Sequence, residues 1–358
     1  MKHRVALIGG FGSVAGARKS LPPSCELVGL CDIKADRIAA CQAEDPSILC
    51  TTDYREIAAM PGCDTVCQLT PNEVHARITI ACLEGGKNVW MEKPIGINLE
   101  ESEAVLAAQQ AAGKHVAVDL EYRFSHMTGN VVKGIIDSGE IGDVLSIEND
   151  HWRGGWTNDT PQGSYRTKRR TSGIMKMEGI HQVDFFRFIA GEVTAIQCFA
   201  APNALPHYEF PDNLTVMFWF ASGARGRYTI NHTRSAMSLG QDWAKAPDAG
   251  HIMFWGITGT KGSLMIDAWR SAIRVFHFVA NPPGSDSLQP ELDRVLDFSA
   301  RPNPMSLFHD MSGYRYDFLE RMARGDGPLQ PLADSIITER IAHLADQTAV
   351  DGVKVDLT

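Results

Sequence analysis

The 358-residue sequence lacks excess positive charge: it has 34 Lys and Arg against 43 Asp and Glu, a net charge of −9. Without a global positive field, a chain has little attraction for a phosphate backbone or an anionic membrane. We therefore expect no nucleic-acid partner and no membrane partner. The one basic run, at 166–170, is either a solvated loop or a site for an anionic substrate.

Long apolar runs and metal-binding cysteine patterns are also missing. No stretch approaches the roughly 18 apolar residues of a transmembrane helix, and the short run at 5–8 leads into glycines instead of forming a secretory signal. There is no Cys-x-x-Cys pair, and neither Cys63 nor Cys67 has the neighbouring His or Cys of a zinc site. We predict no metal, reduced buried thiols and a cytoplasmic location.

Two rare residue types are unevenly distributed. Seven of the eight cysteines fall within the first 82 residues, whereas the first of the seven tryptophans is Trp90. A single core would also be large for a chain of this length. We therefore predict two differently built domains, at 1–121 and 122–358.

The first domain alternates short apolar runs with amphipathic segments, a pattern typical of β-α units in a parallel sheet. The predicted strands are 4–8, 26–31, 65–69, 88–91 and 115–118, and the predicted helices are 12–20, 34–42, 54–59, 73–84 and 99–112. The last helix is well delimited, because Asn98 can cap it, Glu101 occupies the capping-box position and Gly113 ends it. The fold class is α/β with an N-terminal dinucleotide-binding sheet.

Beyond residue 120 the strands become longer and richer in aromatic and β-branched residues, with few helices between them. This texture predicts an α+β domain with a large, mostly antiparallel open sheet. The predicted strands are 144–149, 194–200, 213–220, 226–232, 251–258, 262–267 and 272–279. The predicted helices are 129–138, 178–190, 312–324 and 333–351, and loops are expected at 281–286 and 300–304.

The first strand ends in Gly10-x-Gly12-x-x-Ala15, a form of the dinucleotide fingerprint. Glycines suit this position because the backbone must turn tightly and approach a pyrophosphate at the next helix. Asp32 closes the second strand twenty residues after Gly12, where a carboxylate would accept the ribose hydroxyls. Its charge would repel a 2′-phosphate and so favours NAD over NADP, although Lys34 and Arg37 could weaken that preference. Asp32 could instead simply cap the helix that follows.

Thr70-Pro-Asn-Glu-Val-His75 and Glu92-Lys93-Pro94 follow the next two strands, at the edge where ligands of α/β sheets bind. With the fingerprint, this ordered set resembles the glucose-fructose oxidoreductase / inositol dehydrogenase (Gfo/Idh/MocA) family. The segments 122–124, 138–142, 178–187 and 259–262 extend the resemblance over nearly the whole chain. The predicted cofactor-binding residues are Gly10, Phe11, Gly12, Ser13, Val14, Asp32, Ile33, Arg37, Thr70, Pro71, Asn72, His75, Glu92 and Lys93.

The resemblance implies that Lys93 and His181 are the catalytic residues. A lysine beside a cationic nicotinamide loses proton affinity, and a histidine can move protons near neutral pH. Many relatives have an Asp four residues before the histidine, where this chain has Met177. Either Lys93 and His181 then suffice, or another group contributes: Glu178, Asp184 and Tyr165 are the candidates, and Asp184 could instead be structural.

Substrate specificity is expected from the second domain, where the loop 151–170 combines aromatic rings with cations. This composition suggests an anionic or glycosidic sugar. Arg123 either holds an anion or joins the domains. The predicted substrate residues are Arg123, Trp152, Arg153, Trp156, Tyr165, Arg166, Met177 and Asp184.

These features predict an NAD-dependent dehydrogenase acting on a secondary hydroxyl of a sugar, polyol or sugar derivative. One alternative is a glycosidase that oxidises a sugar hydroxyl transiently, eliminates the aglycone and returns the hydride. Another is a nicotinamide-binding sensor without catalysis, for which Met177 is the only argument. An antiparallel sheet with one uncovered face also predicts a homo-oligomer, a dimer or tetramer formed through that sheet.

Overall fold

The computed structural model describes residues 1–153, 164–232, 251–268, 271–300 and 307–357. The chain forms two compact units, one made of residues 1–120 and 311–340, the other of 121–310 and 341–358. The predicted boundary near residue 121 agrees with this division. Assigning everything after it to the second domain was wrong for 311–340, because helix α8 (Met311–Arg324) packs in the first unit, where Ser24 Oγ donates to Glu320 at 2.9 Å.

The first unit is built on a six-stranded parallel sheet in the order β3-β2-β1-β4-β5-β6. This is the strand order of a dinucleotide-binding fold. Its strands are β1 (His3–Ile8), β2 (Cys25–Cys31), β3 (Leu49–Thr51), β4 (Thr65–Gln68), β5 (Asn88–Met91) and β6 (Val116–Val118). Its helices in the first 120 residues are α1 (Val14–Lys19), α2 (Ala35–Glu44), α3 (Tyr54–Ala59), a 3-10 turn at Asn72–Val74, α4 (His75–Glu84) and α5 (Leu99–Ala112).

The predicted strands and helices of this unit are confirmed, apart from small shifts at their ends and one omission. The missed strand, β3, has three residues, too few to show a periodicity. The predicted caps of α5 are also confirmed: Glu101 N–H donates to Asn98 Oδ1 at 2.9 Å, and Gly113 has a φ of 60°. The Glu101 carboxylate accepts from the Ile97 N–H at 3.0 Å, one residue earlier than a standard capping box predicts.

The cysteines of this unit fill its tightly packed β-α layers. All eight cysteines of the chain lie within the described residues and are free thiols, seven of them buried. Burial raises the pKa of Cys31 and Cys67 to about 12. These thiols are therefore unreactive packing groups.

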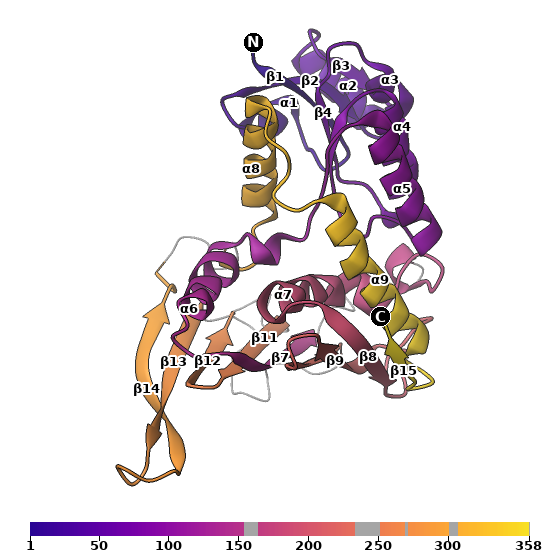
Figure 1. Cartoon of the computed structure of the whole chain (residues 1–358). Coiled ribbons are helices and arrows are strands. Elements are labelled where there is room, and N and C mark those ends of the chain that lie inside the picture. The colour runs from indigo at the N-terminus through magenta and orange to yellow at the C-terminus, as the bar shows by residue number, and fades with distance from the viewer. Residues whose placement is uncertain (154–163, 233–250, 269–270, 301–306, 358) are drawn as a thin grey trace, which may run out of the picture. The chain divides into compact units, whose positions relative to one another are not determined.

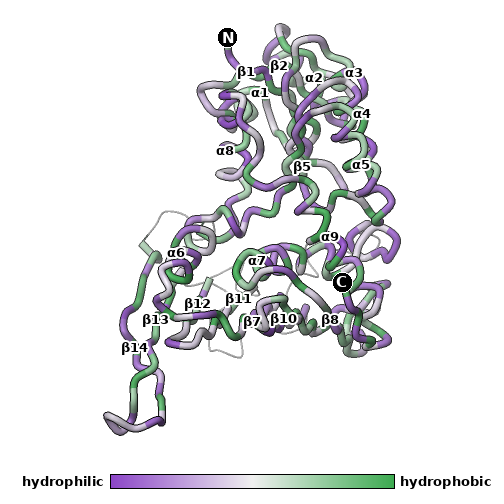
Figure 2. Tube along the Cα trace, in the orientation of Figure 1, coloured by the Kyte–Doolittle hydropathy of each residue, from purple (hydrophilic) through white to green (hydrophobic). Residues whose placement is uncertain are grey.

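The second unit contains a nine-stranded sheet in the order β14-β13-β12-β11-β7-β10-β9-β8-β15. Only the β7–β10 pair is parallel, so the predicted mostly antiparallel sheet is confirmed. The strands are β7 (Val144–Arg153), β8 (Val193–Ala200), β9 (Asn213–Phe220), β10 (Arg225–Asn231), β11 (His251–Gly259), β12 (Gly262–Asp267), β13 (Ala272–Ala280), β14 (Leu288–Asp297) and β15 (Lys354–Asp356). The β13–β14 hairpin extends beyond the other strands of the sheet (Figure 1), and its colour in Figure 2 alternates between hydrophobic and hydrophilic.

Strands β14 and β15 were not predicted. Strand β14 is mostly exposed and contains Pro290, which weakens a strand pattern, and β15 has three residues. The predicted loop at 281–286 lies between β13 and β14, whereas most of the predicted loop at 300–304 lies outside the described residues.

Helix α7 (Ile180–Ala190) covers one face of this sheet, where the rings of Phe186 and Phe218 lie 5.4 Å apart. Side chains of the strands alternate between this covered face and the opposite one, as the burial of β9 shows. Two segments of the unit are π-helical, His126–Val132 before α6 (Lys133–Asp137) and Met175–Gly179 before α7. The predicted helix 333–351 is α9 (Leu332–Thr348), which begins in the first unit and ends in the second. No helix in the described part of the chain is long and apolar enough for a membrane span.

Candidate functional site

The predicted nucleotide loop follows β1, at the carboxyl end of the parallel sheet. Gly10 has a φ of +71°, and a Cβ there would meet the Leu69 side chain at 2.6 Å, so only glycine fits. At Gly12 a Cβ would meet no atom within 4 Å. Packing therefore explains Gly10 but not Gly12, whose open space suits the close approach of a ligand to the backbone. Phe11 and Val14 are buried and anchor the loop.

The start of α1 is already well bonded. Ser13 caps it by accepting from the Gly16 N–H at 3.0 Å, and the Val14 and Ala15 N–H groups donate to the Glu44 carboxylate at 2.9 and 2.8 Å. A pyrophosphate at this edge would therefore rely on the backbone of the glycine loop ahead of these two amides.

Asp32 lies after β2 and has two partners. Its carboxylate accepts from the Lys34 N–H at 2.9 Å and from the Arg37 guanidinium at 2.7 Å. Asp32 therefore holds the turn before α2 (Ala35–Glu44), which has no side-chain cap, and its remaining lone pairs stay suited to ribose hydroxyls. Arg37 is held by Asp32. The neighbouring Ile33 side chain is 88% exposed, an apolar surface beside the position expected for a ribose.

The loops after β4 and β5 are joined by His75. This imidazole is buried, with Nδ1 at 2.6 Å from the Pro94 carbonyl oxygen and Nε2 at 2.7 Å from the Thr70 carbonyl oxygen. Both ring nitrogens thus serve to fix these loops, a structural role that the prediction of a cofactor contact did not include. Asn72 is buried and Pro71 exposed in the same turn.

A residue from the far end of the sequence fixes the loop after Lys93. The Glu339 carboxylate, fully buried on α9, accepts from the Ile95 and Gly96 N–H groups at 2.8 and 3.1 Å and from Ser102 Oγ at 2.8 Å. Glu92 and Lys93 are both partly exposed at the carboxyl end of β5. The predicted catalytic lysine thus follows a strand end and precedes a rigidly bonded turn.

In the second unit, His181 lies in the first turn of α7 and is 5% exposed. The Glu121 carboxylate lies 3.2 Å from its Nδ1. The Tyr122 ring stacks on the imidazole, with 4.9 Å between centroids and 20° between planes. Glu121 also lies 2.5 Å from Nδ1 of His309.

Sequence reasoning missed Glu121 and His309. Glu121 is next to the noted Tyr-Arg-Phe motif at 122–124, but no periodicity relates it to positions 181 and 309. The only local signal in the sequence is an acidic residue beside an aromatic motif.

The groups proposed to compensate for Met177 have other partners. Both oxygens of the Asp184 carboxylate accept from the Arg123 guanidinium, Nε at 2.6 Å, and Asp184 is fully buried. Glu178 faces Arg153 at 3.8 Å. Met177 itself is buried. The Arg123–Asp184 pair thus has the structural geometry that the sequence left open for both residues.

The predicted substrate loop is described only in part. Trp156 lies outside the described residues, whereas Trp152 is nearly buried and Arg153 partly exposed at the end of β7. Tyr165 and Arg166 form a partly exposed 3-10 turn, in which Arg166 Nε donates to Tyr165 Oη at 3.3 Å. Of the basic run, Lys168 Nζ pairs with Glu209 at 2.7 Å and Arg169 Nε donates to the Glu209 carbonyl at 2.9 Å.

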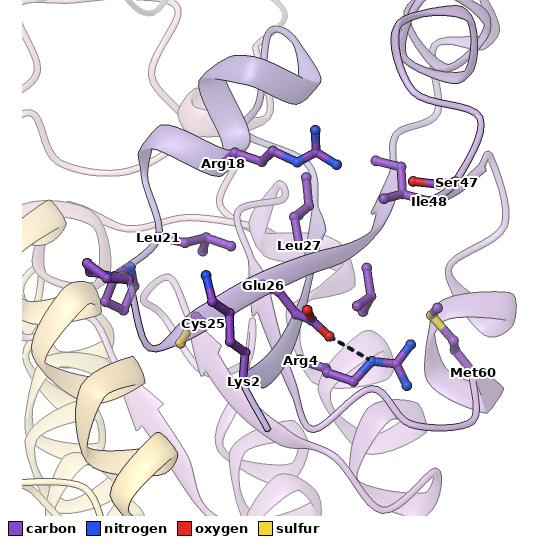
Figure 3. A pocket seen from close by; sticks show the side chains of 13 residues that line it. Lys2, Arg4, Arg18, Leu21, Cys25, Glu26, Leu27, Ser47, Ile48 and Met60 are labelled. Atoms are coloured by element: carbon purple, nitrogen blue, oxygen red, sulfur yellow. Dashed lines mark ion pairs between the residues drawn. The ribbon is translucent and has the colours of Figure 1, made fainter.

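Two further features attract attention but lie elsewhere. A hollow of about 510 Å³ is lined by the starts of β1 and β2, including Lys2, Arg4 and Glu26, the last two paired at 3.4 Å (Figure 3). It lies at the amino end of the strands, opposite the nucleotide loop, so the rule for ligands of α/β sheets does not apply to it.

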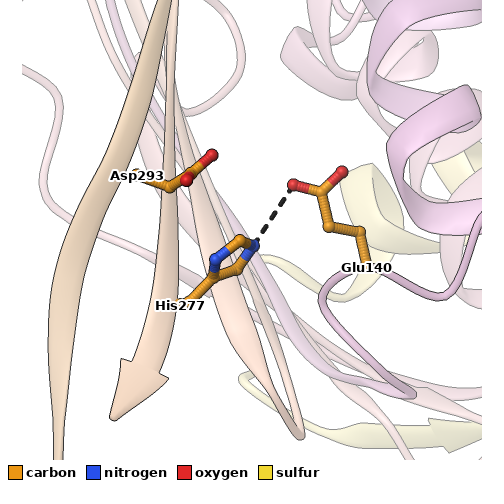
Figure 4. Close-up of side chains that lie close together, drawn as sticks. All are labelled: Glu140, His277 and Asp293. Atoms are coloured by element: carbon orange, nitrogen blue, oxygen red, sulfur yellow. Dashed lines mark hydrogen bonds and ion pairs between the residues drawn. The ribbon is translucent and has the colours of Figure 1, made fainter.

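Glu140, His277 and Asp293 are the one group of potential metal ligands found among the described residues (Figure 4). The Arg294 guanidinium pairs with both carboxylates, at 2.6 Å in each case. A cation of the chain itself therefore already offsets part of the negative charge of this group.

Comparison with known proteins identifies the family. Residues 3–120 match the model of the GFO/IDH/MocA oxidoreductase family with an NAD-binding Rossmann fold, and residues 130–265 match the GFO/IDH/MocA C-terminal domain. Together these matches include more than half of the chain. The chain belongs to the Gfo/Idh/MocA family. The predicted resemblance and the predicted fold class are both confirmed.

Similar Gfo/Idh/MocA proteins are named as oxidoreductases and dehydrogenases. The uncharacterised oxidoreductase YrbE of Bacillus subtilis is 29% identical over 60% of this chain and 62% of its own length. Inositol 2-dehydrogenase of Salmonella typhimurium is 30% identical over 47% of each chain. The matches thus span about half to three-fifths of these two relatives. Among solved structures, levoglucosan dehydrogenase in complex with NADH has a TM-score of 0.79 and 22% identity, with both chains fully covered.

Proposed function

We propose that this Gfo/Idh/MocA protein is an NAD-dependent dehydrogenase that oxidises a secondary hydroxyl of a sugar, a polyol or a sugar derivative. The observation that carries the proposal is His181, a buried imidazole beside a buried carboxylate, in a chain whose other unit has the strand order and glycine loop of a dinucleotide-binding sheet. The relatives named above are dehydrogenases or oxidoreductases, which favours this activity over the transient oxidation of a glycosidase.

The first unit fits a bound NAD. Gly12 leaves space beside the backbone for a pyrophosphate, Asp32 offers lone pairs for ribose hydroxyls, and exposed Ile33 offers an apolar surface for a base. When bound, NAD supplies the hydride acceptor of the reaction. The negative charge of Asp32 favours NAD over NADP, and the Arg37 that could weaken this preference is paired with Asp32.

Lys93 and His181 perform the acid–base work in this proposal. As hydride leaves the carbon, the hydroxyl proton must pass to a base, and an imidazole accepts it near neutral pH. The Lys93 ammonium group orients the hydroxyl or takes part in the same transfer. The aromatic and cationic residues Trp152, Arg153, Tyr165 and Arg166 contact the rest of the substrate.

The activity is tested by incubating the protein with NAD and a panel of sugars and polyols, including inositols and anhydrosugars, and recording absorbance at 340 nm. We expect NADH to form with at least one member. NAD binding is measured separately by calorimetry, and a protein that binds NAD yet stays silent across the panel would argue against a dehydrogenase.

We also propose a homo-oligomer formed through the uncovered sheet face. Phe199 and Met265 are 45% and 52% exposed and, by their register, lie on the face opposite α7. Trp219 on β9 shares this face, whereas Phe218 beside it is buried. Light scattering at micromolar concentration should show a dimer or tetramer, and Met265→Lys should shift it toward smaller species. A wild-type monomer would contradict this proposal.

The eight free thiols support a reducing, cytoplasmic location for the protein. Fractionation of the source cells with an antibody against the chain would test it.

A further inference from the structure

Glu121 is a carboxylate with no exposure to solvent at the start of the 3-10 turn Glu121–Arg123. An isolated buried carboxylate is costly, so such a group persists only with close partners. The described partners are the Nδ1 atoms of His181 at 3.2 Å and His309 at 2.5 Å. Although burial alone would raise the pKa of Glu121, the two histidines hold it well below its ordinary value. The group is therefore an anion held between two imidazoles.

The neighbouring residue fixes the same imidazole from another side. The Tyr122 ring stacks on His181 and meets the His309 ring edge-on at 5.9 Å between centroids. One dipeptide thus supplies both an aromatic plane and a charge to His181. Two other cations of this unit pair with other carboxylates: Arg153 with Glu178, and Arg123 with Asp184.

We propose that Glu121 is the positioning residue of His181 and sets which ring nitrogen carries its proton, an inference that rests on the proposed dehydrogenase function. An ionised carboxylate has only lone pairs to offer, so the Nδ1 atom facing it must carry the hydrogen. Nε2 of His181 then keeps its lone pair and can accept the proton of a substrate hydroxyl. The resulting imidazolium is stabilised by the Glu121 charge, as carboxylate–histidine pairs in other enzymes are.

His181 Nδ1 and the Glu121 carboxylate lie 3.2 Å apart but lack the alignment of a hydrogen bond, so Nδ1 has no hydrogen-bond partner among the described residues. Ligand-free active sites commonly show such loose geometry, which tightens when substrate binds. His309 shares the carboxylate from a more open position: its side chain is 39% exposed, against 6% for His181.

The test uses imidazole ¹⁵N and ¹H NMR of the full-length protein, with His181→Asn and His309→Asn to assign the signals. We expect neutral His181 to be the Nδ1–H form in the wild type. In Glu121→Gln we expect this preference for the Nδ1–H form to be lost. An unchanged tautomer of His181 in a folded Glu121→Gln protein would overturn the proposal.

Kinetics provide a second readout. Glu121→Gln should lower kcat about 10- to 100-fold, the usual cost of removing such a supporting carboxylate, and should move the acidic limb of the pH–rate profile while leaving NAD affinity unchanged. Glu121→Asp should restore part of the loss. Glu140→Gln is the matched control, because it removes a carboxylate 3.3 Å from His277 in the same unit and should change neither His181 nor kcat.

If no sugar is oxidised but the NMR results are as expected, the proposed substrate fails while the role of Glu121 stands. If sugars are oxidised but Glu121→Gln leaves the NMR signals of His181 unchanged, the inference fails and the proposed function stands.

Discussion

The two units assemble their functional residues in different ways. In the first unit, the residues of each predicted contact are neighbours in sequence, because each parallel strand delivers one short loop to the same edge of the sheet. In the second, Glu121, His181 and His309 come from three distant segments. Residues at the ligand edge of a parallel sheet can therefore be recognised as contiguous sequence motifs. The candidate site residues of this α+β unit come together only through tertiary packing.

The largest effect that tests this contrast concerns Lys93, a motif residue of the first unit. Lys93→Met should lower kcat about 10²- to 10⁴-fold, because it removes an acid–base or orienting group without changing side-chain size greatly. NAD affinity, measured by calorimetry beside a 340 nm assay, should fall less than kcat, although Lys93 is also one of the predicted cofactor-binding residues. Near-normal turnover would show that the Glu-Lys-Pro motif is structural in this chain.

The next effect concerns Glu339, the distant residue on which the Lys93 loop depends. Glu339→Gln should destabilise the protein by about 2–3 kcal/mol, because the amide NH2 replaces one carboxylate oxygen and then faces either the Ile95 N–H or the Gly96 N–H, donor against donor. Urea unfolding measures this loss of stability. Glu103→Gln is a matched control, since Glu103 forms only an exposed ion pair with Arg340 among its described contacts. Equal stability of the two variants would contradict the anchoring role.

A smaller effect separates binding from folding at the glycine loop. Gly12→Val should weaken NAD binding roughly 10- to 100-fold, about 1.4–2.7 kcal/mol, yet leave the unfolding midpoint unchanged, because the added side chain meets no protein atom near its Cβ. Gly10→Ala should destabilise the fold itself by about 1–3 kcal/mol, since φ is +71° and Leu69 blocks the Cβ. Calorimetric titration and thermal melts distinguish the two, and a destabilised Gly12→Val would refute the distinction.

The smallest effect depends on pH and concerns the second unit. Burial lowers the pKa of His232 from 6.5 to about 3. Between pH 6.5 and pH 3, this imidazole therefore binds a proton in the unfolded chain but not in the folded chain. Stability should therefore fall as pH drops from 6.5 toward 3, by up to about 2 kcal/mol at pH 5. His232→Gln should flatten this dependence in urea titrations. If the unfolding free energy of the variant falls as steeply with pH as that of the wild type, groups other than His232 cause the pH dependence.

The sequence predicted most of the fold because periodicity and caps are local properties. Helix α5 is delimited by Asn98 and Gly113, whereas β15 is too short for any pattern and α8 reads as an ordinary helix that could join either unit. In the candidate site, the spacing of the sequence predicted Gly12 and Asp32 as cofactor-binding residues. Glu121 was not predicted, because its contacts with His181 and His309 form only in the folded chain.

The bond between Glu339 and the Lys93 loop also has a consequence for biosynthesis. A ribosome has made all six strands of the first sheet by residue 118, but the carboxylate that secures residues 95 and 96 emerges near the end of the chain. Most multidomain chains fold from the amino terminus as they are made. Here residues 311–340 of the amino-terminal unit are made last, so a gene cut at residue 120 would yield a first fragment without this part of its own unit, which the second fragment would encode.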